Sequence, residues 1–358
     1  MWNWMESDEI DGFRISLLKW YGKHRRPFPW RRNPTPYRVW ISEIMLQQTQ
    51  AKSALPYFNR FLKRFPSIES LADATEEEIL VHWSGLGYYS RARNLHKAAR
   101  RIIQLHDGVF PADYKTVLSL PGIGRYSAGA ICSIAFNQRQ PVVDGNIRRV
   151  IARLRGSRSR IPEKYFWDRM AEWVPEKQAS SFNQAMMELG ALICKPRNPL
   201  CDVCPLTRIC RAYQTQQVAD FPKRQKLKTI PQYHIAVGVV FRNERVLITR
   251  RKAEGLLGGL WEFPGGKIKD GESAQAACLR EIKEEVNLDV QIDRHLVQVK
   301  HAYTHFRIVM EVFCCKYVSG RVYLRGPMAF RWIRLNEYKN YPFPKANHKF
   351  IPLLIRSA

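Results

Sequence analysis

The chain has 358 residues, and its 58 Lys and Arg against 32 Asp and Glu give a formal net charge of +26 at pH 7. This surplus favours a polyanionic partner and predicts salt-sensitive binding, although charge alone does not choose among DNA, RNA and an anionic membrane. The sequence contains no run of about 18 apolar residues, so it predicts no membrane span. Residues 1–10 also lack the cationic start of a secretory signal. We therefore expect a cytoplasmic protein with two domains, each able to bury its own core.

The first part of the chain, over about residues 7–213, has helical periodicity and no convincing strand alternation. Its first predicted helix, 8–21, places Phe13 and Leu17 at core spacing. The loop at 25–32 is stiffened by two prolines and combines aromatic rings with four arginines. It is either a surface loop with a tucked tryptophan or the wall of a pocket that holds an extruded base by stacking.

A second helix is predicted over 37–58, and it carries a single acidic residue, Glu43, between apolar neighbours. A lone Glu on an amphipathic helix is usually solvated. The alternative is an isolated carboxylate at the rim of an apolar surface, where it would be available for chemistry.

The segment 85–93 joins two further predicted helices and contains two glycines, two tyrosines and two arginines. Such a loop can contact phosphates through its backbone and place a ring between bases. The alternative is a glycine-capped helix end followed by a basic helix face.

The sequence LPGIG at 120–124 precedes a predicted helix over 125–136. Pro121-Gly122 is a strong turn signal, and Gly124 allows the backbone to pass close to a partner. Unpaired N–H groups at a helix start suit a phosphate oxygen. An ordinary corner between packed helices would have the same features.

Asp144 follows in the sequence Asp144-Gly145-Asn146, directly before a helix predicted to begin at Ile147. Its simplest role is that of a helix N-cap. A carboxylate fixed at a helix start beside a phosphate-binding turn would also lie near a bound sugar, so Asp144 is a candidate catalytic residue as well.

Two features end the helical part. Glu188 lies inside a helix predicted over 180–194 and is either a core buttress or a pocket wall. Four cysteines have the spacing C-x6-C-x2-C-x5-C, and four thiolates within 17 residues need a metal in a reducing compartment. Zinc is the generic alternative, although structural zinc sites usually have two short knuckles and this sequence has one. The four are Cys194, Cys201, Cys204 and Cys210.

After a basic linker at 216–231, the periodicity changes to that of strands, predicted at 234–241 and 245–249 with two more within 297–317. Between them, a predicted helix carries Glu281, Glu284 and Glu285 at i, i+3 and i+4. Three carboxylates on one helix face can share Mg²⁺ that bridges a diphosphate. The alternative is a solvated acidic face.

Together these motifs resemble the adenine DNA glycosylases of the MutY type, in the helix-hairpin-helix endonuclease III superfamily. The resemblance rests on SEIMLQQT around Glu43, PGIGRYSA at the hairpin, VDGN at Asp144, the cysteine spacing and a Nudix-like signature, and it spans nearly the whole chain. It implies an all-α glycosylase domain at 1–215 with an iron–sulfur loop at 194–210, the linker at 216–231, and a Nudix-like α/β domain at 232–358.

The resemblance implies excision of adenine mispaired with 8-oxoguanine or guanine in duplex DNA. Relatives that also cut the strand carry a lysine where this chain has Tyr126, so base removal without strand cleavage is expected. Glu43 would protonate adenine, Asp144 would stabilise the charged sugar, and Tyr126 and Asn146 would position these groups. The four cysteines would hold a [4Fe–4S] cluster.

The resemblance also assigns contacts to the DNA. The expected adenine pocket contains Arg26, Trp30, Arg31, Leu46 and Glu188. Tyr88 would be the wedge, Gln48 would lie where the base stack opens, and the other expected DNA contacts are Leu86, Arg91, Gly122, Gly124 and Arg148. A loop similar to the Phe-Ser-His loop that reads 8-oxoguanine is formed by Tyr303, Thr304 and His305.

Two alternatives stay open. The Nudix signature is complete except that Asn287 replaces a glycine, whereas adenine glycosylases generally have a degraded metal box, so a second, Mg²⁺-dependent activity on an oxidised nucleotide or another diphosphate is possible. The other alternative is a thymine-specific or bifunctional glycosylase. In either case a monomer associated with the nucleoid is the expectation.

Overall fold

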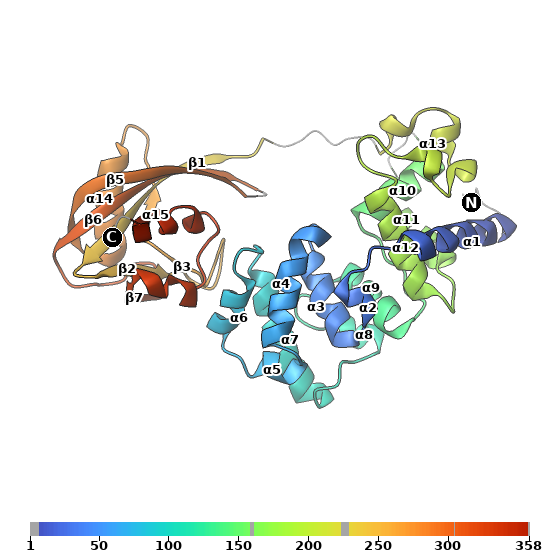
Figure 1. The fold of residues 1–358 in the computed structure, drawn as a ribbon, viewed down its shortest axis with the longest axis horizontal. Coiled ribbons are helices and arrows are strands. Elements are labelled where there is room, and N and C mark those ends of the chain that lie inside the picture. The colour runs from blue at the N-terminus through green and yellow to red at the C-terminus, as the bar shows by residue number, and fades with distance from the viewer. Residues whose placement is uncertain (1–6, 158–160, 223–228, 304, 357–358) are drawn as a thin grey trace. The chain divides into compact units, whose positions relative to one another are not determined.

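The structure is a computed structural model that describes residues 7–157, 161–222, 229–303 and 305–356 (Figure 1). Thr304 of the expected reading loop and residues 223–228 of the expected linker lie outside the described residues. The chain divides into two compact units: Met1–Ala72 with Lys97–Lys226, and Asp73–His96 with Leu227–Ala358. None of the described helices has the length and apolar character needed to cross a membrane.

The first unit is built from helices, as predicted, and no strand occurs among its described residues. α7 (Ser90–His106) begins in the second unit and continues into the first. The other helices of the first unit are α1 (Ser7–His24), α2 (Pro29–Arg32), α3 (Pro36–Leu46), α4 (Ala51–Arg64), α5 (Ile68–Ala72), α8 (Tyr114–Leu118), α9 (Arg125–Phe136), α10 (Gly145–Arg155), α11 (Glu163–Trp173), α12 (Ala179–Leu192) and α13 (Arg211–Gln214).

One predicted helix is wrong. The segment 37–58 forms two helices, α3 and α4, because the chain turns at residues 47–50. Gln48 adopts a φ of 56°, in the left-handed region, and Gln50 is the extended N-cap of α4. A left-handed residue interrupts the ladder of helical hydrogen bonds, so periodicity of the flanking apolar residues alone did not reveal the break.

The centre of the first unit is formed by α3, α9, α10 and α12, which pack in the order α3 on α9, α9 on α12, and α12 on α10. Gly190 permits the last of these contacts. A Cβ atom at position 190 would lie 2.5 Å from the Cβ of Asn146, which is closer than packed side chains approach. The absence of a side chain at Gly190 therefore brings α12 against the start of α10.

The second unit contains a seven-stranded mixed sheet with the order β3-β2-β1-β6-β5, in which β4 also pairs with β1 and β7 with β2. β1 and β6 are parallel, and the other pairs are antiparallel. The predicted strands are confirmed, with the third beginning earlier than expected. The strands are β1 (Gln232–Arg242), β2 (Arg245–Arg250), β3 (Trp261–Glu262), β4 (Gly265–Lys267), β5 (Asp289–Ala302), β6 (Arg307–Ser319) and β7 (Ala329–Arg334).

Hydrophobic clusters cover both faces of this sheet. α14 (Ala274–Val286) contributes Cys278 and Ile282 to one cluster, and α15 (Ile351–Arg356) contributes Leu354 to the other. Alternate residues of β1, such as Val239 and Val240, belong to opposite clusters, as the period of a strand requires. The predicted α/β character of the C-terminal part is thereby confirmed.

Residues 73–96, with α6 (Glu76–Trp83), pack with the second unit, whereas the sequence placed them within 1–215. The indole N–H of Trp261 donates to Glu77 Oε1 (2.7 Å), and Tyr89 donates through its hydroxyl to the Phe343 carbonyl (3.4 Å). Helical periodicity identifies a buried face without identifying its partner, so this packing could not be read from the sequence. The domain boundaries at 215 and 232 stay a prediction.

Candidate active site

A cavity of about 640 Å³ lies in the first unit, lined by side chains from α2, α3, α9, α10 and α12 and from the start of α4. It collects residues that are far apart in the sequence, from Arg26 to Ala191. All of the expected catalytic residues line it: Glu43, Tyr126, Asp144 and Asn146. The expected adenine-pocket residues also line it: Arg26, Trp30, Arg31, Leu46 and Glu188. Gln48 is a further lining residue.

Glu43 is buried on α3, with 5% of its surface exposed, although a lone Glu on a helix is usually solvated. Burial is the main cause that raises the pKa of its carboxyl, Tyr126 and Arg31 lower it, nearby Asp144 raises it, and the net pKa is about 7. The Tyr126 hydroxyl lies 3.3 Å from Glu43 Oε2 and donates to it. Glu43 is thus a carboxyl group that retains a proton near neutral pH.

Tyr126 is held between Glu43 and a residue that the sequence did not single out. Its hydroxyl lies 3.3 Å from the Met187 sulfur as well as from Glu43. Burial, Glu43 and Asp144 raise the pKa of Tyr126 well above its ordinary range, so the hydroxyl keeps its proton and acts as a donor. The methionine–methionine–glutamate run before Leu189 offered no polar signal for Met187.

Asp144 is the N-cap of α10, as the sequence predicted. Its Oδ1 accepts from the Ile147 N–H (2.7 Å), and its Oδ2 accepts from Asn146 Nδ2 (2.9 Å). Burial raises the pKa of Asp144, while these two hydrogen bonds and the nearby Arg149 favour the ionised form. The cap fixes the carboxylate at the cavity wall without using all of its acceptor capacity.

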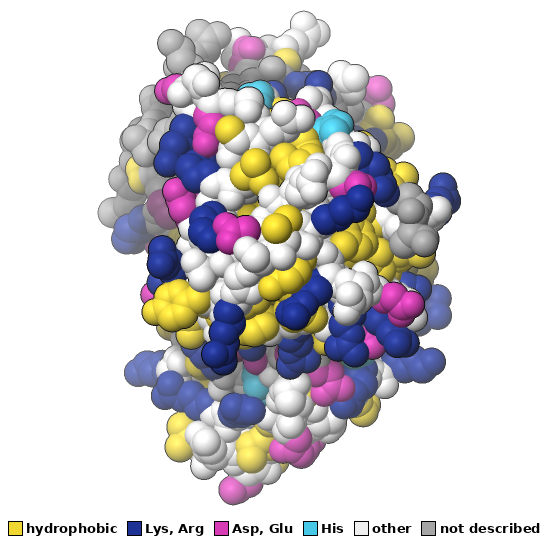
Figure 2. Space-filling view, turned by 90° about the vertical axis from the view of Figure 1, so that its left-hand side faces the viewer, with side chains coloured by type: hydrophobic (Ala, Val, Ile, Leu, Met, Phe, Trp, Pro, Cys, Tyr) yellow, Lys and Arg dark blue, Asp and Glu magenta, His cyan; other side chains and the backbone are white. Residues whose placement is uncertain are grey.

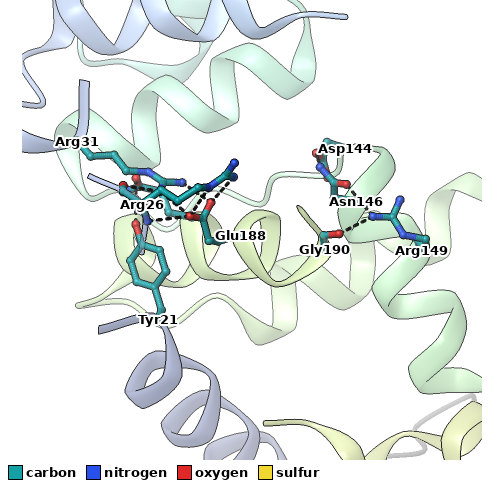
Figure 3. Close-up of polar contacts among 9 residues, drawn as sticks. Tyr21, Arg26, Arg31, Asp144, Asn146, Arg149, Glu188 and Gly190 are labelled. Carbon is teal, nitrogen blue, oxygen red and sulfur yellow. Dashed lines mark hydrogen bonds and ion pairs between the residues drawn. The ribbon is translucent and has the colours of Figure 1, made fainter. Parts of the chain in front are cut away.

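Arg149 supports this arrangement and was not predicted as a site residue (Figure 3). Its guanidinium donates to Asn146 Oδ1 (2.8 Å) and to the Gly190 carbonyl (2.7 Å). It also donates to the Cys194 carbonyl (2.7 Å). Asn146 is oriented in this way and can direct its amide toward Asp144. The i, i+3 spacing of Asn146 and Arg149 was the available sequence signal.

Glu188 forms the most extensive ionic contact in the cavity wall (Figure 3). Its carboxylate accepts five hydrogen bonds of 2.8–3.0 Å, from the backbone and guanidinium of Arg26 and from the guanidinium of Arg31. Burial alone would raise the pKa of Glu188, but the two arginines outweigh it and lower the pKa to about 2. A carboxylate has about four lone-pair sites, so these hydrogen bonds leave Glu188 no free acceptor for a substrate. Glu188 instead orients the two guanidinium groups, which are the polar groups that this wall offers.

We expect Glu188→Gln to lower the free energy of unfolding by about 1.5–3 kcal/mol, because hydrogen bonds to charged groups are lost and two partly buried arginines lose their counter-ion. Adenine excision should fall as well, since Arg26 and Arg31 lose their fixed orientation. Urea unfolding and single-turnover excision measure the two effects. Glu176→Gln, whose side chain is 80% exposed, is the matched control, and equal stability of the two variants would contradict the prediction.

Trp30 and Phe28 make the apolar part of the wall. Their rings are stacked with centroids 4.7 Å apart and planes at 12°. Trp30 also meets Phe58 edge to face at 5.1 Å. The proline-stiffened loop is therefore a wall of the cavity, and the alternative of a plain surface loop is wrong.

The other expected DNA contacts of the first unit lie apart from the cavity lining. Gly122 has a φ of 79° in the turn between α8 and α9, and Gly124 is the extended N-cap of α9. Both glycines are exposed, so their backbone is accessible. Arg148 forms an ion pair with Glu163 on α11.

The expected contacts of residues 85–93 and of the reading loop belong to the second unit. Tyr88 has a φ of 49°, and its ring lies edge to face with His305, at 6.5 Å between centroids. Arg91 places its guanidinium 5.3 Å from the Tyr88 ring, and Leu86 is buried. Tyr303 stacks on Phe306 with centroids 4.6 Å apart, so within this unit the expected wedge and reading loop adjoin each other.

The four clustered cysteines form no disulfide, and they lie close enough to influence one another electrostatically. Burial, together with the nearby Cys194, Cys210 and Cys201, raises the pKa of the Cys204 thiol to about 12, although a backbone hydrogen bond lowers it. Arg153 on α10 is buried and donates to Cys194 Sγ (3.3 Å) and to the Lys195 carbonyl (2.7 Å). Soft donors that converge beside a buried cation fit an anionic iron–sulfur group. Among the described residues, no three or more His, Cys, Asp or Glu side chains lie close enough together to bind one metal ion. This spacing is compatible with a four-iron cluster, because each thiolate then binds a different iron atom and the four thiolates lie further apart.

The acidic helix of the second unit is α14. Arg280 donates to Glu272 (2.7 and 2.9 Å), to Glu281 (2.7 Å) and to Glu284 (3.1 Å). Burial raises the pKa of Glu285 to about 7, and Glu262 and Glu281 add to the rise. Glu281 and Glu285 are partly buried beside an arginine and the sheet, whereas Glu284 is exposed, so only part of this helix face is solvated.

Three family models match successive parts of the chain. Residues 41–176 match the HhH-GPD superfamily base excision DNA repair protein, residues 194–210 match the iron-sulfur binding domain of endonuclease III, and residues 236–353 match the NUDIX domain. Part of the chain is similar in structure to a thermostable thymine-DNA glycosylase (30% identity, TM-score 0.54, 57% of this chain and 97% of that one). A structure of a non-covalent endonuclease III–DNA complex shares the fold (22% identity, TM-score 0.52, 59% and 98%).

These matches and the cavity define a base-excision DNA glycosylase with a helix-hairpin-helix domain, an iron–sulfur loop and a C-terminal Nudix domain. The adenine DNA glycosylase of Mus musculus is 34% identical over 93% of this chain and 76% of its own length, and that of Buchnera aphidicola subsp. Acyrthosiphon pisum (strain APS) is 38% identical over 82% and 83%. The chain belongs to the adenine DNA glycosylase family. It is an enzyme that hydrolyses the N-glycosidic bond of adenine in duplex DNA, and residues 194–210 bind an iron–sulfur cluster.

Proposed function

We propose that the enzyme removes adenine mispaired with 8-oxoguanine or guanine and leaves the strand uncut. The observation that carries this proposal is the single cavity in which a proton-bearing carboxyl, Glu43, lies near a capped carboxylate, Asp144. Tyr126 occupies the hairpin position at which a strand-cutting relative has an amine. The enzyme acts as a monomer at the nucleoid, with a [4Fe–4S] cluster on its four clustered cysteines and with Tyr303, Thr304 and His305 reading the opposite base.

Protonation of the base is the task of Glu43. Tyr126 donates to Oε2 of Glu43, which leaves Oε1 to carry the proton and deliver it to N7 of the flipped adenine. Moving the adenine out of the duplex costs a few kcal/mol of lost stacking. Contacts of the base with the Trp30 ring and with the two arginines at Glu188 compensate for this cost. A protonated adenine is a better leaving group, since the bond electrons pass to a neutral base.

Stabilisation of the sugar is the task of Asp144. As the glycosidic bond lengthens, positive charge grows on the deoxyribose, and the fixed carboxylate opposes that charge electrostatically or through a transient covalent bond. Asn146, oriented by Arg149, keeps Asp144 at this position. A water molecule completes the hydrolysis. A cluster bound by the four cysteines would hold the basic loop at 194–210 rigid and would take no part in the chemistry. Proton transfer and charge stabilisation are the work of Glu43 and Asp144.

A single-turnover assay tests the proposal. The substrate is a duplex with one labelled adenine opposite 8-oxoguanine, and the products are analysed with and without alkali. Strand breaks that appear only after alkali support base removal without strand cleavage. Lys52 is an exposed amine that also lines the cavity, so breaks without alkali that disappear in Lys52→Ala would overturn the uncut-strand proposal.

The rate of excision should depend on pH through Glu43. Its pKa is raised to about 7, and the reaction needs the protonated form. The rate should therefore be constant below pH 7 and fall about tenfold per pH unit above it, as the protonated fraction falls. Single-turnover rates across this range check the profile, and a rate that stays constant well above pH 7 would contradict the role of Glu43.

A second activity is favoured by one observation in the Nudix domain. Asn287, the single departure from the metal-box signature, caps α14 with a φ of 59°. This is the left-handed conformation for which glycine is usually needed, and asparagine tolerates it. The backbone that ends the box helix is therefore retained, and the carboxylates Glu281, Glu284 and Glu285 keep the helical spacing for Mg²⁺.

We expect Mg²⁺-dependent release of phosphate or pyrophosphate from 8-oxo-dGTP and its loss in Glu284→Gln. Glu284 is partly exposed, so the substitution should leave the fold intact. Glu254→Gln is the control, because Glu254 is exposed and lies outside the box. Equal release by both variants, or release without Mg²⁺, would reject this second activity and leave adenine excision unaffected.

A further inference from the structure

One face of the second unit's sheet carries rings and arginines along β7. Phe330, Trp332 and Arg334 alternate with residues on the other face, because successive side chains of a strand point to opposite sides. Trp332 is paired with Leu247 of β2, and Arg334 with Arg245; directly paired residues share a face. Leu247 belongs to the hydrophobic cluster beneath α14, so these residues lie on the α14 side of the sheet.

The rings on this face are partly exposed and are held by an arginine. Tyr317 of β6 and Trp332 meet edge to face, with centroids 6.5 Å apart. The guanidinium carbon of Arg242 lies 4.7 Å from the Tyr317 centroid and 6.0 Å from the Trp332 centroid. Both rings pack at the margin of the cluster without being buried, and Phe330 is 40% exposed. The fold leaves this aromatic surface uncovered.

The segment 320–328, which joins β6 to β7, also contains arginines and an aromatic ring, and it lies along the end of α14. The Tyr323 N–H donates to the Val286 carbonyl (3.1 Å), and the Arg325 N–H donates to the Glu285 carbonyl (2.9 Å). Alternate residues of this segment pack on the hydrophobic cluster, so those between them point outward. Arg321, Tyr323 and Arg325 are exposed, Tyr323 at 63%.

Basic residues predominate in the segments that form this surface. From residue 312 to residue 336 the sequence contains one Lys and four Arg and no Asp or Glu. Two of these basic residues are paired with acids from elsewhere in the chain, Lys316 with Asp293 and Arg331 with Glu77. Figure 2 shows Lys and Arg side chains, with hydrophobic and some Asp and Glu side chains between them, on the side of the molecule that lies at the left of Figure 1. Within the part of the chain that the structure describes, five arginines here form no ion pair: Arg242, Arg245, Arg321, Arg325 and Arg334.

We propose that this surface, the arginine–aromatic face, binds single-stranded DNA. Unpaired guanidinium groups attract a chain of phosphates, and half-exposed rings offer flat surfaces for stacking. A duplex hides the faces of its bases, whereas a single strand exposes them, so only the latter satisfies both components. An acidic peptide would satisfy the charges alone. The site lies on the Nudix domain and is separate from the cavity in the first unit, so it would let the enzyme hold an unpaired strand while it processes a mispair.

Photo-crosslinking of the full chain, with its cluster loaded, tests this proposal. The probe is a short oligodeoxythymidylate that contains 5-bromodeoxyuridine, and the cross-linked peptides are identified by mass spectrometry. Adducts are expected at Tyr317, Phe330 or Trp332. Arg334→Glu should lower their yield about tenfold, because reversing a phosphate-contacting charge weakens binding strongly at low salt. Arg356→Glu, in α15 on the opposite side of the sheet, makes the same change in charge and should leave the yield unchanged.

Two results would overturn the proposal. One is an equal yield of these adducts in Arg334→Glu and Arg356→Glu, or adducts confined to the first unit. The other is displacement of the oligonucleotide from this face by a polyglutamate peptide of equal charge at equal concentration, which would favour an acidic protein partner. Adenine excision from duplex DNA by Arg334→Glu should proceed at the rate of the unmodified chain, and an unchanged urea unfolding transition verifies that the second unit of the variant is folded.

Discussion

Glu43→Gln is expected to lower the single-turnover rate of adenine excision by about 10²–10⁴-fold, the contribution of a positioned general acid. Glutamine has nearly the same shape and can accept the hydrogen bond from Tyr126, but it has no proton of suitable acidity to give to adenine. The cavity should therefore keep its form. Binding of the duplex, measured by fluorescence anisotropy, should be unchanged while excision is nearly lost.

The control for this variant is Glu176→Gln, which makes the same chemical change on the surface and should excise at the unmodified rate. The pH dependence gives a second, independent check. If Glu43 is the proton donor, the residual activity of Glu43→Gln should not fall as pH rises through 7. Substantial excision by Glu43→Gln would show that another group protonates the base.

Asp144→Asn is expected to lower excision by about 10²–10³-fold, the effect of removing one preorganised electrostatic group from a transition state. Asparagine is as good an N-cap as aspartate, so its side-chain oxygen can keep the bond to the Ile147 N–H. The substitution thus removes the negative charge that faces the sugar and leaves the start of α10 in place. A rate within a few-fold of the unmodified enzyme would exclude a charged role for Asp144.

The comparison with Asp144→Ala separates the two functions of this residue. Alanine removes both the charge and the cap, so it should also lower the free energy of unfolding by about 1 kcal/mol. Asp144→Asn should unfold at the same urea concentration as the unmodified chain. Equal stability of the alanine and asparagine variants would mean that the cap contributes nothing.

Features that depend on neighbouring residues were predictable from the sequence. The N-cap at Asp144, the helix over 125–136 and the first two strands follow from capping, turn and alternation signals that lie within a few positions. The cysteine spacing, likewise, predicted the residues that match the iron-sulfur binding domain.

Features that depend on distant residues were not predictable. Glu43 is buried where α3 packs on α9, and its raised pKa follows from that burial. Glu188 uses its acceptors on two arginines about 160 positions away. The left-handed Gln48 and the packing of 73–96 with the second unit also have no local signal. Periodicity shows that a face is buried, and it leaves open which partner buries it.

The glycine at position 190 has a consequence for the whole cavity. Helix α12 carries Glu188, which orients the groups that hold the base, and α10 starts at Asp144, which faces the sugar. Because these helices touch at Gly190, one missing methyl group sets the spacing between the base-holding and the sugar-facing walls. The distance between the two helices at Gly190 therefore helps to set the width of the cavity, although Gly190 itself does not line it.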